Sequence, residues 1–407
     1  MRRTLIACSL VLTGLLAACA GPQLPPQQRV AVQGQAQSGH QMVTLHWRTP
    51  AELQDLVSSG LDLFAPDHVR KELTGRLSTA EIVRLQQQGI RVQVQTARAR
   101  AAEERQAFPT GYMTYAQLKA RLQALAAARP DLVRLEDVGD TWDKQQGKAD
   151  HDIWAVQLNP GQRQGKPTVL MTGGVHAREL APVELLSKLI DQLVAGYGQD
   201  ERITRLLNSR NLVILPMVNV DGRVKVEQGS AWQRKNTHGT GIDLNRNFDN
   251  HWNYAGLSVP DSWKRGISDP NSEIYSGSAP ASEPETQVVQ AIMHRYKPIV
   301  FVDMHAYGEL MLWPLGYQSA DIAQVGIYRD LWQKSLKPLD FKGGNSPQLL
   351  YPTTATTRDY AYQQHRAMSM TIEVGKDFRP SYAEVEKMWS QLRGPLLSIL
   401  EAPGLGN

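Results

Sequence analysis

The chain has 407 residues, of which 42% are hydrophobic and 21% are charged, as in an ordinary globular protein with a sizeable core. The formal net charge is only +4 and no basic run stands out, so nucleic acid is not indicated as a partner. The two cysteines, Cys8 and Cys19, both lie near the N-terminus, so we expect no disulfide to stabilise the fold.

The N-terminus has the layout of a secretory signal. Two arginines precede an apolar stretch at residues 5–18, which is too short to span a bilayer comfortably. The letters LAAC at residues 16–19 resemble a bacterial lipobox, which implies a signal peptide over residues 1–18 and a lipid on Cys19. Because Ala20 is not an aspartate, the resemblance favours an outer-membrane lipoprotein facing the periplasm, or a secreted form. The alternative is a plain signal peptide with a chance cysteine.

Three segments follow before the main domain. Residues 19–40 are rich in Gln, Pro and Gly, which is typical of a tether. Residues 41–97 predict strand, helix, strand, strand, helix, strand, the order of a small α+β, ferredoxin-like module. Its second helix begins with a capping box, because Ser78 stands three residues before Glu81. Residues 98–109 have no apolar stripe and predict a linker.

Residues 110–402 alternate between helical periodicity and short apolar strands, which predicts one α/β domain with a mixed central sheet flanked by helices. The first helix is expected in TYAQLKARLQALAAARP and a later one in ELLSKLIDQLVAGY. The expected strands are LVRLEDVG, DIWAVQL, PTVLMT, NLVILPMVN, IVFVDMHAY and MSMTIEV.

The strand PTVLMT runs into GGVHAREL, which places His176 and Glu179 three residues apart. The two glycines, Gly173 and Gly174, let the backbone turn sharply, and both side chains can then reach one point. Histidine nitrogen and carboxylate oxygen are good zinc ligands. Taken alone, however, this spacing is more often a chance pair or a helix cap.

A third ligand candidate, His305, ends the very apolar strand IVFVDMH. A lone histidine there is more often a satisfied core residue. Ligands that leave the same edge of an α/β sheet are, however, what a site at the strand ends requires. The three residues together therefore favour a metal site.

Three further groups have chemistry that suits such a site. Asn245 and Arg246 lie in the polar loop IDLNRNFD and can bind a carboxylate by paired hydrogen bonds. Arg234 in AWQRKN can stabilise an oxyanion. Glu373 lies in the apolar strand MSMTIEV and has the chemistry of a general base. The alternatives are a polar turn, a surface arginine and a glutamate on an edge strand, respectively.

These segments resemble the zinc metallocarboxypeptidases of the pancreatic carboxypeptidase type, peptidase family M14, over about residues 110–400. HARE resembles the family's HSRE, HAY matches its third-ligand segment, and QRKN, DLNRNF and SEPET resemble further family segments. The resemblance implies a carboxypeptidase-like, zinc-exopeptidase fold with one zinc ion. It also implies zinc ligands and substrate contacts, which would be His176, Glu179 and His305 for zinc, and Arg178 and Tyr307 for substrate.

The end of the domain resembles the family by spacing. Tyr351 precedes Asp359 by eight residues, and Glu373 follows Asp359 by fourteen, as in the family. The resemblance implies that Tyr351 closes over the substrate's carboxylate with Asn245 and Arg246, and that Glu373 is the catalytic base. Arg234 would polarise the scissile carbonyl. The implied reaction is hydrolysis of the last peptide bond of a substrate with a free C-terminal carboxylate, by a monomer.

The chain departs from the family at two places near Asp359. Arg358 stands at the base of the specificity pocket, which favours C-terminal Glu or Asp side chains. The alternative is that Arg358 turns outward or pairs with Asp359, leaving a neutral pocket. Ala355 and Thr356 replace the family's usual glycine pair, which puts the pocket's size and the closure of the loop in doubt.

Other interpretations stay open at this point. The module at 41–97 resembles the propeptide of secreted family members, or it is a spacer or a substrate-binding unit. Of these, we expect a permanent module rather than a propeptide that is removed. A cell-wall carboxypeptidase that cuts stem peptides, between glutamyl and diaminopimelate residues, is an alternative substrate assignment. A non-catalytic, lipid-anchored binding protein is disfavoured, because the ligands and the base are all present.

Overall fold

The computed structural model describes residues 39–95, 108–158 and 165–406. The predicted signal peptide, nearly all of the tether with Cys19, and most of the linker at 98–109 therefore lie outside the described residues. Within the described part of the chain, no helix is both long and apolar enough to cross a membrane.

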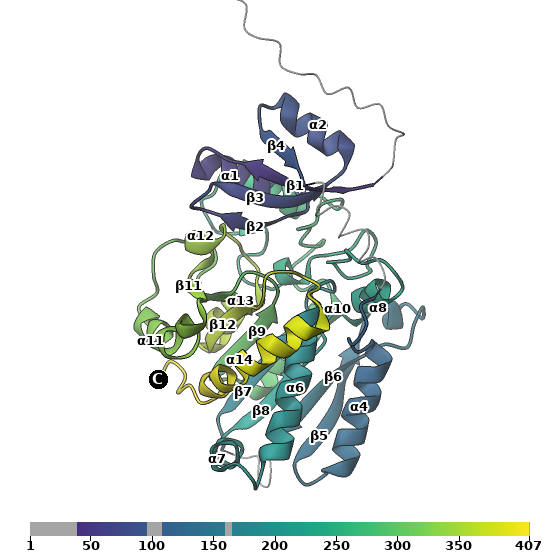
Figure 1. The fold of residues 1–407 in the computed structure, drawn as a ribbon, viewed down its shortest axis with the longest axis vertical. Coiled ribbons are helices and arrows are strands. Elements are labelled where there is room, and N and C mark those ends of the chain that lie inside the picture. The colour runs from purple at the N-terminus through teal and green to yellow at the C-terminus, as the bar shows by residue number, and fades with distance from the viewer. Residues whose placement is uncertain (1–38, 96–107, 159–164, 407) are drawn as a thin grey trace, which may run out of the picture. The chain divides into compact units, whose positions relative to one another are not determined.

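The first described region is a four-stranded antiparallel sheet with two helices (Figure 1). Its elements are β1 (Gln41–His46), α1 (Pro50–Val57), β2 (Leu63–Asp67), β3 (Glu72–Leu77), α2 (Thr79–Gln87) and β4 (Arg91–Val94). The strand order β2-β3-β1-β4 is that of a ferredoxin-like unit. The predicted capping box is present, because Ser78 and Glu81 each accept a hydrogen bond from the other's backbone N–H. We refer to residues 41–94 as the module.

The remaining strands form one eight-stranded sheet in the order β11-β10-β12-β9-β7-β8-β6-β5. Neighbours from β12 to β8 are parallel, and β6 and β5 extend the sheet in antiparallel fashion. This is the mixed sheet that the sequence predicts. The strands are β5 (Val133–Asp140), β6 (Asp152–Leu158), β7 (Thr168–Gly173), β8 (Asn211–Leu215), β9 (Val300–His305), β10 (Leu310–Leu312), β11 (Lys342–Gly344) and β12 (Met368–Glu373).

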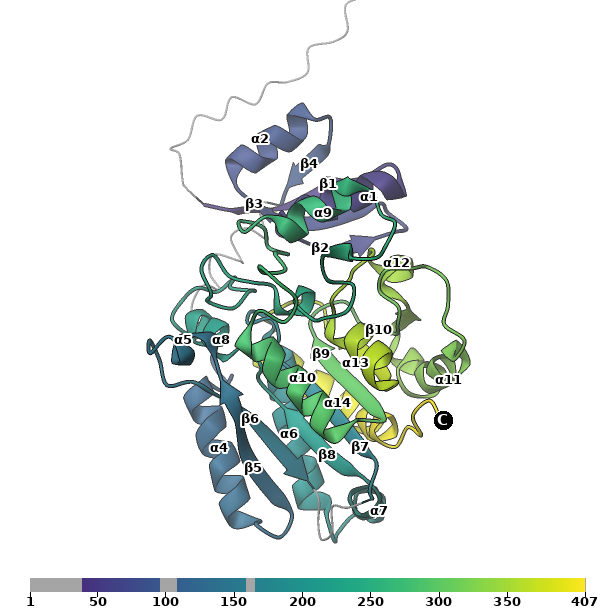
Figure 2. The same ribbon diagram turned by 180° about the vertical axis from the view of Figure 1, so that it is seen from behind.

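Helices cover both faces of this sheet. α6 and α14 lie on the face seen in Figure 1, and α10 and α13 lie on the face seen in Figure 2. Every residue of β7, β8 and β9 is buried, which is why these strands are continuous apolar runs rather than alternating ones. The helices are α4 (Tyr115–Ala128), α5 (Trp142–Gln145), α6 (Leu180–Gly196), α7 (Glu201–Ser209), α8 (Val220–Glu227), η1 (Leu244–Arg246), η2 (Trp252–Tyr254), α9 (Asp261–Ser268), α10 (Pro284–Tyr296), α11 (Val325–Ser335), η3 (Lys337–Leu339), α12 (Ser346–Leu349), α13 (Thr357–His365) and α14 (Tyr382–Leu400).

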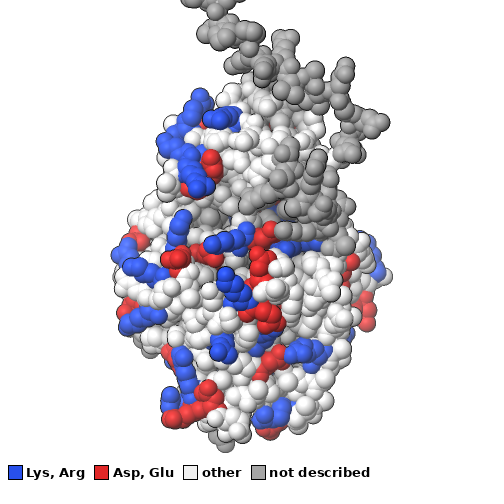
Figure 3. Space-filling view, viewed as in Figure 1, with Lys and Arg blue, Asp and Glu red and all other residues white. Residues whose placement is uncertain are grey.

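Charged side chains of both signs are mixed over the face shown in Figure 3, and neither sign dominates it. Several of them pair across helices. Lys188 of α6 lies 2.6 Å from Glu386 of α14, and Arg202 of α7 lies 2.7 Å from Glu401 just after α14. Exposed pairs of this kind contribute little to stability, so the packing of α14 depends on its buried apolar side.

The parallel strands β7, β9 and β12 end at one edge of the sheet, and this edge positions the candidate site. Glu373 lies opposite His305 in the pairing of β12 with β9. Two short strands at this side, β10 and β11, were not predicted from the sequence. Each has only three residues, which is too short for an alternating pattern to be recognised.

Candidate active site

Two of the predicted ligands lie in the turn from β7 into α6. Gly174 has a φ of +62°, and a Cβ there would lie 3.3 Å from the Met217 backbone, so the turn requires glycine for both its conformation and its close approach. His176 follows within the turn, and Glu179 is the last residue before α6. Glycine in GGVHAREL therefore permits the tight turn at the sheet edge.

The third predicted ligand, His305, is the last residue of β9, beside β7 in the sheet. One ligand atom from each of His176, Glu179 and His305 lies within 4.8 Å of the others. All three side chains are buried, with exposed fractions of 4%, 3% and 1%. The structure therefore brings together the three residues that the sequence predicts to meet.

Two carboxylates fix the orientation of the histidine rings. Asp243 Oδ1 lies 3.1 Å from His176 Nε2, and Asp303 Oδ2 lies 2.8 Å from His305 Nε2. Both Nδ1 atoms consequently face the Glu179 carboxylate, at 2.7 and 2.9 Å. This ligand set fits zinc, because metal-binding histidines typically give one ring nitrogen to the metal and the other to a carboxylate.

Neither of these carboxylates was predicted from the sequence. The sequence did contain a signal for Asp303. Side chains two residues apart on a strand point to the same side, and Asp303 stands two residues before His305 in β9. Asp243 lies in the polar loop, two residues before Asn245, and is brought to His176 only by tertiary folding. No spacing rule within the sequence connects those two positions.

Opposite charges control the ionisation of this cluster. Burial alone would raise the pKa of Glu179, but the facing His176 and His305 hold it well below its usual range. Burial would lower the pKa of His305, but Asp303 and Glu179 raise it well above its usual value. In Asp243, burial is likewise overcome by Arg234 and His176, which lower its pKa. The carboxylates are therefore held ionised, as metal binding requires.

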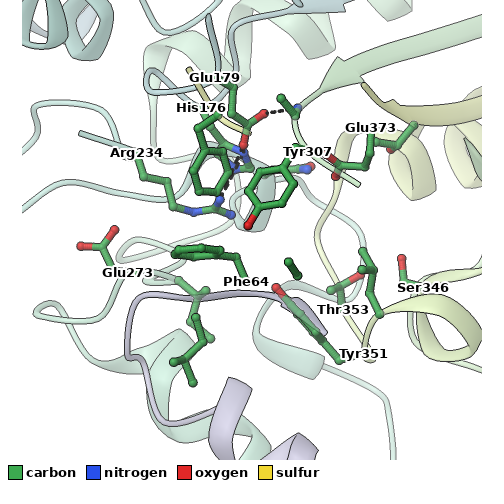
Figure 4. A pocket seen from close by; sticks show the side chains of 18 of the residues that line it. Phe64, His176, Glu179, Arg234, Glu273, Tyr307, Ser346, Tyr351, Thr353 and Glu373 are labelled. Atoms are coloured by element: carbon green, nitrogen blue, oxygen red, sulfur yellow. Dashed lines mark hydrogen bonds and ion pairs between the residues drawn. The ribbon is translucent and has the colours of Figure 1, made fainter. Parts of the chain in front are cut away.

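Glu373 ends β12, which lies between β9 and β10 in the interior of the sheet. The alternative of a solvent-facing glutamate on an edge strand is therefore wrong. Its side chain lines the same cavity as His176 and Glu179 (Figure 4). Burial raises its pKa to about 8, while His305 opposes the rise.

Arg234 reaches the ligand cluster from the loop that follows α8. Its Nη2 donates to Asp243 Oδ2 at 2.8 Å, and its Nη1 lies 3.3 Å from His176 Nδ1. The backbone carbonyl of Arg234 accepts from Ala177 N–H at 3.1 Å. The guanidinium is thereby aimed into the cavity rather than to solvent, which rejects the surface-arginine alternative.

The predicted carboxylate-binding residues also line this cavity. Asn245 and Arg246 lie in η1 and are buried, and the Arg246 Nη1 donates to the Asn245 carbonyl at 2.8 Å. The Asn245 Oδ1 accepts from Thr357 N–H at 3.0 Å, which ties η1 to the start of α13. Tyr351 lines the same cavity, across from His176 and Arg234 (Figure 4).

Arg358 is buried and lines the cavity, so the alternative in which it turns outward is wrong. Its Nε lies 3.2 Å from Asp359 Oδ1, as the other alternative anticipates. Its Nη2 donates to Ser346 Oγ at 3.0 Å, and its Nη1 lies 3.5 Å from Thr371 Oγ1. The Thr353 hydroxyl, also on the cavity wall, is buried without a hydrogen-bond partner among the described residues.

The module contributes to the cavity wall as well. Asp62 forms an ion pair with Arg178 at 2.8 Å, and both side chains are buried. Phe64 packs edge to face on Phe378, with ring centroids 5.0 Å apart, and Figure 4 shows it among the residues lining the cavity. His68 Nε2 donates to the Leu350 carbonyl at 3.0 Å, next to Tyr351. Arg178 and Tyr351 are therefore in contact with, or beside, the module.

The fold and the site define an α/β protein with a His-Glu-His metal site at the carboxyl ends of parallel strands. The family model of zinc carboxypeptidases (Peptidase_M14) matches residues 118–393. The chain therefore belongs to the zinc carboxypeptidase family, a family of peptide hydrolases, and zinc is the metal that its ligand set is built to hold.

Individual proteins agree with this assignment. A zinc carboxypeptidase of Saccharothrix mutabilis subsp. capreolus is 30% identical over 286 residues, which is 66% of this chain and 64% of that protein. Carboxypeptidase O of Bos taurus is 30% identical over 236 residues, 54% of this chain and 60% of that protein. The chain thus spans less than two thirds of the length of these relatives. The crystal structure of carboxypeptidase A from Helicoverpa armigera superposes with a TM-score of 0.74 at 21% identity, over 91% of this chain and 98% of the other, which supports the fold.

Proposed function

We propose that this protein is a zinc-dependent carboxypeptidase that removes the C-terminal residue of peptides. One observation carries the proposal: a single cavity is lined by two of the three zinc-ligand candidates, by the candidate base Glu373 and by the carboxylate-binding Arg246, and the third ligand candidate lies beside the first two. The first two features suit hydrolysis of an amide, and the third suits recognition of a free chain end. Their coincidence supports an exopeptidase rather than an endopeptidase.

The residues divide the chemistry among themselves. Zinc, when bound, supplies a Lewis acid and an activated water. Glu373 faces the cavity, takes a proton from the attacking water and passes it to the leaving amine. Arg234 is held by Asp243 and donates to the oxygen on which negative charge develops.

Recognition of the chain end uses the loop of η1. Arg246 presents a guanidinium to the terminal carboxylate, and Asn245 adds an amide donor beside it. Tyr351 lies across the cavity and closes over the bound carboxylate. Tyr307 and Arg178, on the side lined by the module, contact the residues that precede the scissile bond.

The pocket around Arg358 supports a preference for C-terminal Glu or Asp. Asp359 binds the Nε of Arg358, but the two Nη groups point to the hydroxyls of Ser346 and Thr371, which carry no compensating charge. The unpartnered hydroxyl of Thr353 adds a further donor. A substrate carboxylate therefore finds a cation and a hydroxyl donor, whereas an apolar side chain would leave the Thr353 hydroxyl buried and unpaired.

The same cationic pocket favours one second candidate. A stem-peptide residue such as diaminopimelate also carries a carboxylate on its side chain, and Arg358 would accept it equally well. A non-catalytic binding protein, in contrast, has no observation in its favour. It would not need a base such as Glu373 beside a complete ligand set.

The module is proposed to cover the site in the intact chain. Asp62 occupies Arg178, and Phe64 lines the cavity that a peptide must enter. Cleavage between the module and the main domain would release this cover, and the sequence there contains Arg98, Arg100 and Arg105. The earlier expectation of a permanent spacer is therefore less well supported than a propeptide-like cover.

The location of the protein follows only from its N-terminus. The signal-like start and the lipobox-like LAAC sequence support a lipid on Cys19 and a place in the bacterial cell envelope. The membrane would then be reached through the lipid, and the protein would act as a monomer. Radiolabelled palmitate incorporated into wild-type protein but not into Cys19→Ala would test the anchor, and equal labelling of both would refute it.

The test of activity uses peptides that differ only in their last residue, which is Phe, Lys, Glu or Asp. The zinc-loaded chain is incubated with the mixture before and after limited trypsin treatment, with and without a chelator, and the products are followed by mass spectrometry. We expect chelator-sensitive loss of single C-terminal Glu or Asp residues, faster after trypsin.

Other products would change specific parts of the proposal. Preferential loss of Phe would keep the carboxypeptidase and refute the role of Arg358. Trimming of muropeptides in place of all four peptides would favour the stem-peptide substrate. Equal rates before and after trypsin, with the linker shown to be cut, would refute the covering role of the module.

A further inference from the structure

Arg234 and Asp243 are carried by a loop that has no helix or strand of its own. The loop runs from the end of α8 to η1, across residues 228–243. At one point it is tied to the ligand turn, because the Arg234 carbonyl accepts from Ala177 N–H at 3.1 Å and from Asn219 Nδ2 at 3.2 Å. These bonds fix the backbone of Arg234 but leave the rest of the loop to be held by something else.

Asn236 closes the loop on itself. Its backbone N–H donates to the Ile242 carbonyl at 3.1 Å, and its side-chain Oδ1 accepts from the Ile242 N–H at 2.9 Å. The turn between them is tight, since a Cβ on Gly241 would lie 2.9 Å from the Asn236 carbonyl. The loop is held from outside by Lys235 Nζ, which donates to the Ser272 carbonyl at 2.7 Å, and by the Asp243 N–H, which donates to the Tyr275 carbonyl at 2.8 Å. Asn236 sets the distance between Arg234 and Asp243, and its Nδ2 reaches a further anchor.

That anchor is the carboxylate of Glu283, the residue that precedes α10. It accepts from Asn236 Nδ2 at 2.8 Å, from His238 Nδ1 at 3.0 Å and from the Ser282 hydroxyl at 2.7 Å. The Glu283 side chain is fully buried. His238 is itself fixed by stacking on Trp142, with ring centroids 3.5 Å apart.

The backbone of Glu283 holds a second arm of the site. Its N–H donates to Asn247 Oδ1 at 3.1 Å, and the Asn247 Nδ2 donates to oxygens within residues 276–282. Asn247 directly follows Arg246, the proposed partner of the substrate's carboxylate. Glu283 therefore holds the loop that carries Arg234 (the oxyanion arm) through its side chain. It holds the segment that carries Arg246 (the carboxylate arm) through its main chain.

We propose that Glu283 is a positioning residue for the carboxypeptidase reaction, which holds Arg234 in place through Asn236. Because the side chain and the main chain of Glu283 hold different groups, a side-chain substitution should affect kcat and KM differently. A side-chain substitution displaces the Arg234 arm, which acts in the transition state, and leaves the N–H bond to Asn247 intact. It should therefore lower kcat while KM changes little.

The test compares Glu283→Gln with wild type as zinc-loaded full chains, before and after trypsin treatment, on the peptide that wild type cleaves best. The glutamine has wild-type size but turns an NH2 group towards the donors of Asn236 and His238. We expect kcat to fall about 10- to 100-fold, the scale of a misplaced catalytic group, and KM to stay within about threefold of wild type. The inhibition constant of a free C-terminal amino acid, which binds the Arg246 arm, should be unchanged.

Two further variants make the result specific. Glu283→Asp keeps the carboxylate on a shorter side chain and should recover part of the lost kcat, which also covers the case in which the glutamine variant does not fold. Glu285→Gln is the matched control on the same helix. Its main partner is Trp142 N–H, at 3.0 Å, and its contact to Asn236 is longer at 3.3 Å, so kcat should remain near wild type.

The inference rests on the proposed activity, and the wild-type assay separates their failures. If wild type trims no peptide, both fall. If wild type is active and folded Glu283→Gln keeps its kcat, or loses no more than Glu285→Gln, the positioning role alone is overturned. A rise in KM at constant kcat, or no effect of Glu283→Asp when the glutamine variant cannot be purified, would overturn it as well.

Discussion

The two halves of the active site are positioned by different means. His305 and Glu373 end neighbouring parallel strands, and the hydrogen bonds of the sheet set their separation. Arg234 and Arg246 lie on the segment between α8 and η2, where side chains such as Asn236 and Asn247 provide the bonds that a strand would provide. The strand-end half is fixed by regular backbone pairing, and the loop half is fixed by a buried polar network.

This difference predicts different responses to substitution. Changing a strand-end group should remove its chemistry without moving its neighbours, because the sheet remains. Changing a partner of the loop half should act at a distance, because the polar network supports this half.

The largest effect is expected at the strand end. Glu373→Gln keeps the size of the side chain but removes the base, and kcat should fall by up to about 10⁴-fold. Zinc content, measured by atomic emission, should stay equal to wild type because the three ligands are untouched. A variant that loses its zinc would show that Glu373 supports the ligand cluster rather than the proton transfer.

The corresponding change in the loop half is Arg234→Ala. It removes one donor from the oxyanion and should lower kcat about 10²–10³-fold. Because Arg234 also pairs with Asp243, the melting temperature should fall too, unlike that of Glu373→Gln. Steady-state kinetics and calorimetry on the same preparations test this, and Arg234→Lys is the control that keeps the charge. Unchanged kcat in Arg234→Ala would contradict the assigned role.

The carboxylates behind the histidines should affect zinc binding more than turnover. Asp303→Asn leaves the His305 Nε2 without its carboxylate, so zinc affinity should fall about 10- to 100-fold. Asp243→Asn disturbs His176 and Arg234 together, and should lower both zinc affinity and kcat at saturating zinc. Zinc affinity is measured by competition with a chromophoric chelator. Equal zinc affinity in Asp303→Asn and wild type would contradict the account.

The specificity pocket gives a smaller and selective effect. Arg358→Leu removes the cation, and the ratio of kcat/KM for C-terminal Glu over Phe should fall about tenfold or more, because bonds to a charged group are worth ~1.5–3 kcal/mol. Competition between the two peptides in one reaction measures this ratio directly. The alternative of a neutral Arg358–Asp359 pair predicts no change in the ratio.

The smallest effect concerns stability. Burial raises the pKa of Glu285 to about 7, whereas an unfolded glutamate titrates near 4.3. Between these values the folded state holds the proton and the unfolded state does not, so this group makes the protein less stable as pH rises from about 5 to about 7. Glu285→Gln carries no such cost, so its stability relative to wild type should improve by up to ~3 kcal/mol from pH 5 to pH 8. Urea unfolding at the two pH values tests this, and a pH-independent difference would contradict it.

The same comparison explains what the sequence could predict. The strand-end residues follow apolar runs such as IVFVDMH, whose pattern indicates buried parallel strands, so their meeting at one edge follows from topology. Asp243 is far along the chain from its partner His176, and Glu283 is far from its partner Asn236. No periodic pattern in the sequence connects either pair. Their role depends on loop conformation, which single-sequence reasoning does not reach. The resemblance to the family identified Arg234 and Arg246, but not what holds them.

The module shows a similar boundary. Its element order and its capping box could be predicted from local patterns. The ion pair of Asp62 with Arg178 could not, because 116 positions separate the two residues and no pattern in the sequence links them. The contact places the module over residues that were expected to face substrate. It changes the expectation for the intact chain from an open enzyme to a covered one.

The most direct test is a zinc titration of peptide trimming by the metal-free, trypsin-treated chain. The account predicts that the rate rises in proportion to added zinc and stops rising at one zinc per chain, and that His305→Ala shows no such rise at the same zinc concentrations. Full activity of the metal-free chain, or a wild-type titration curve in His305→Ala, would contradict the assignment of the reaction to this site.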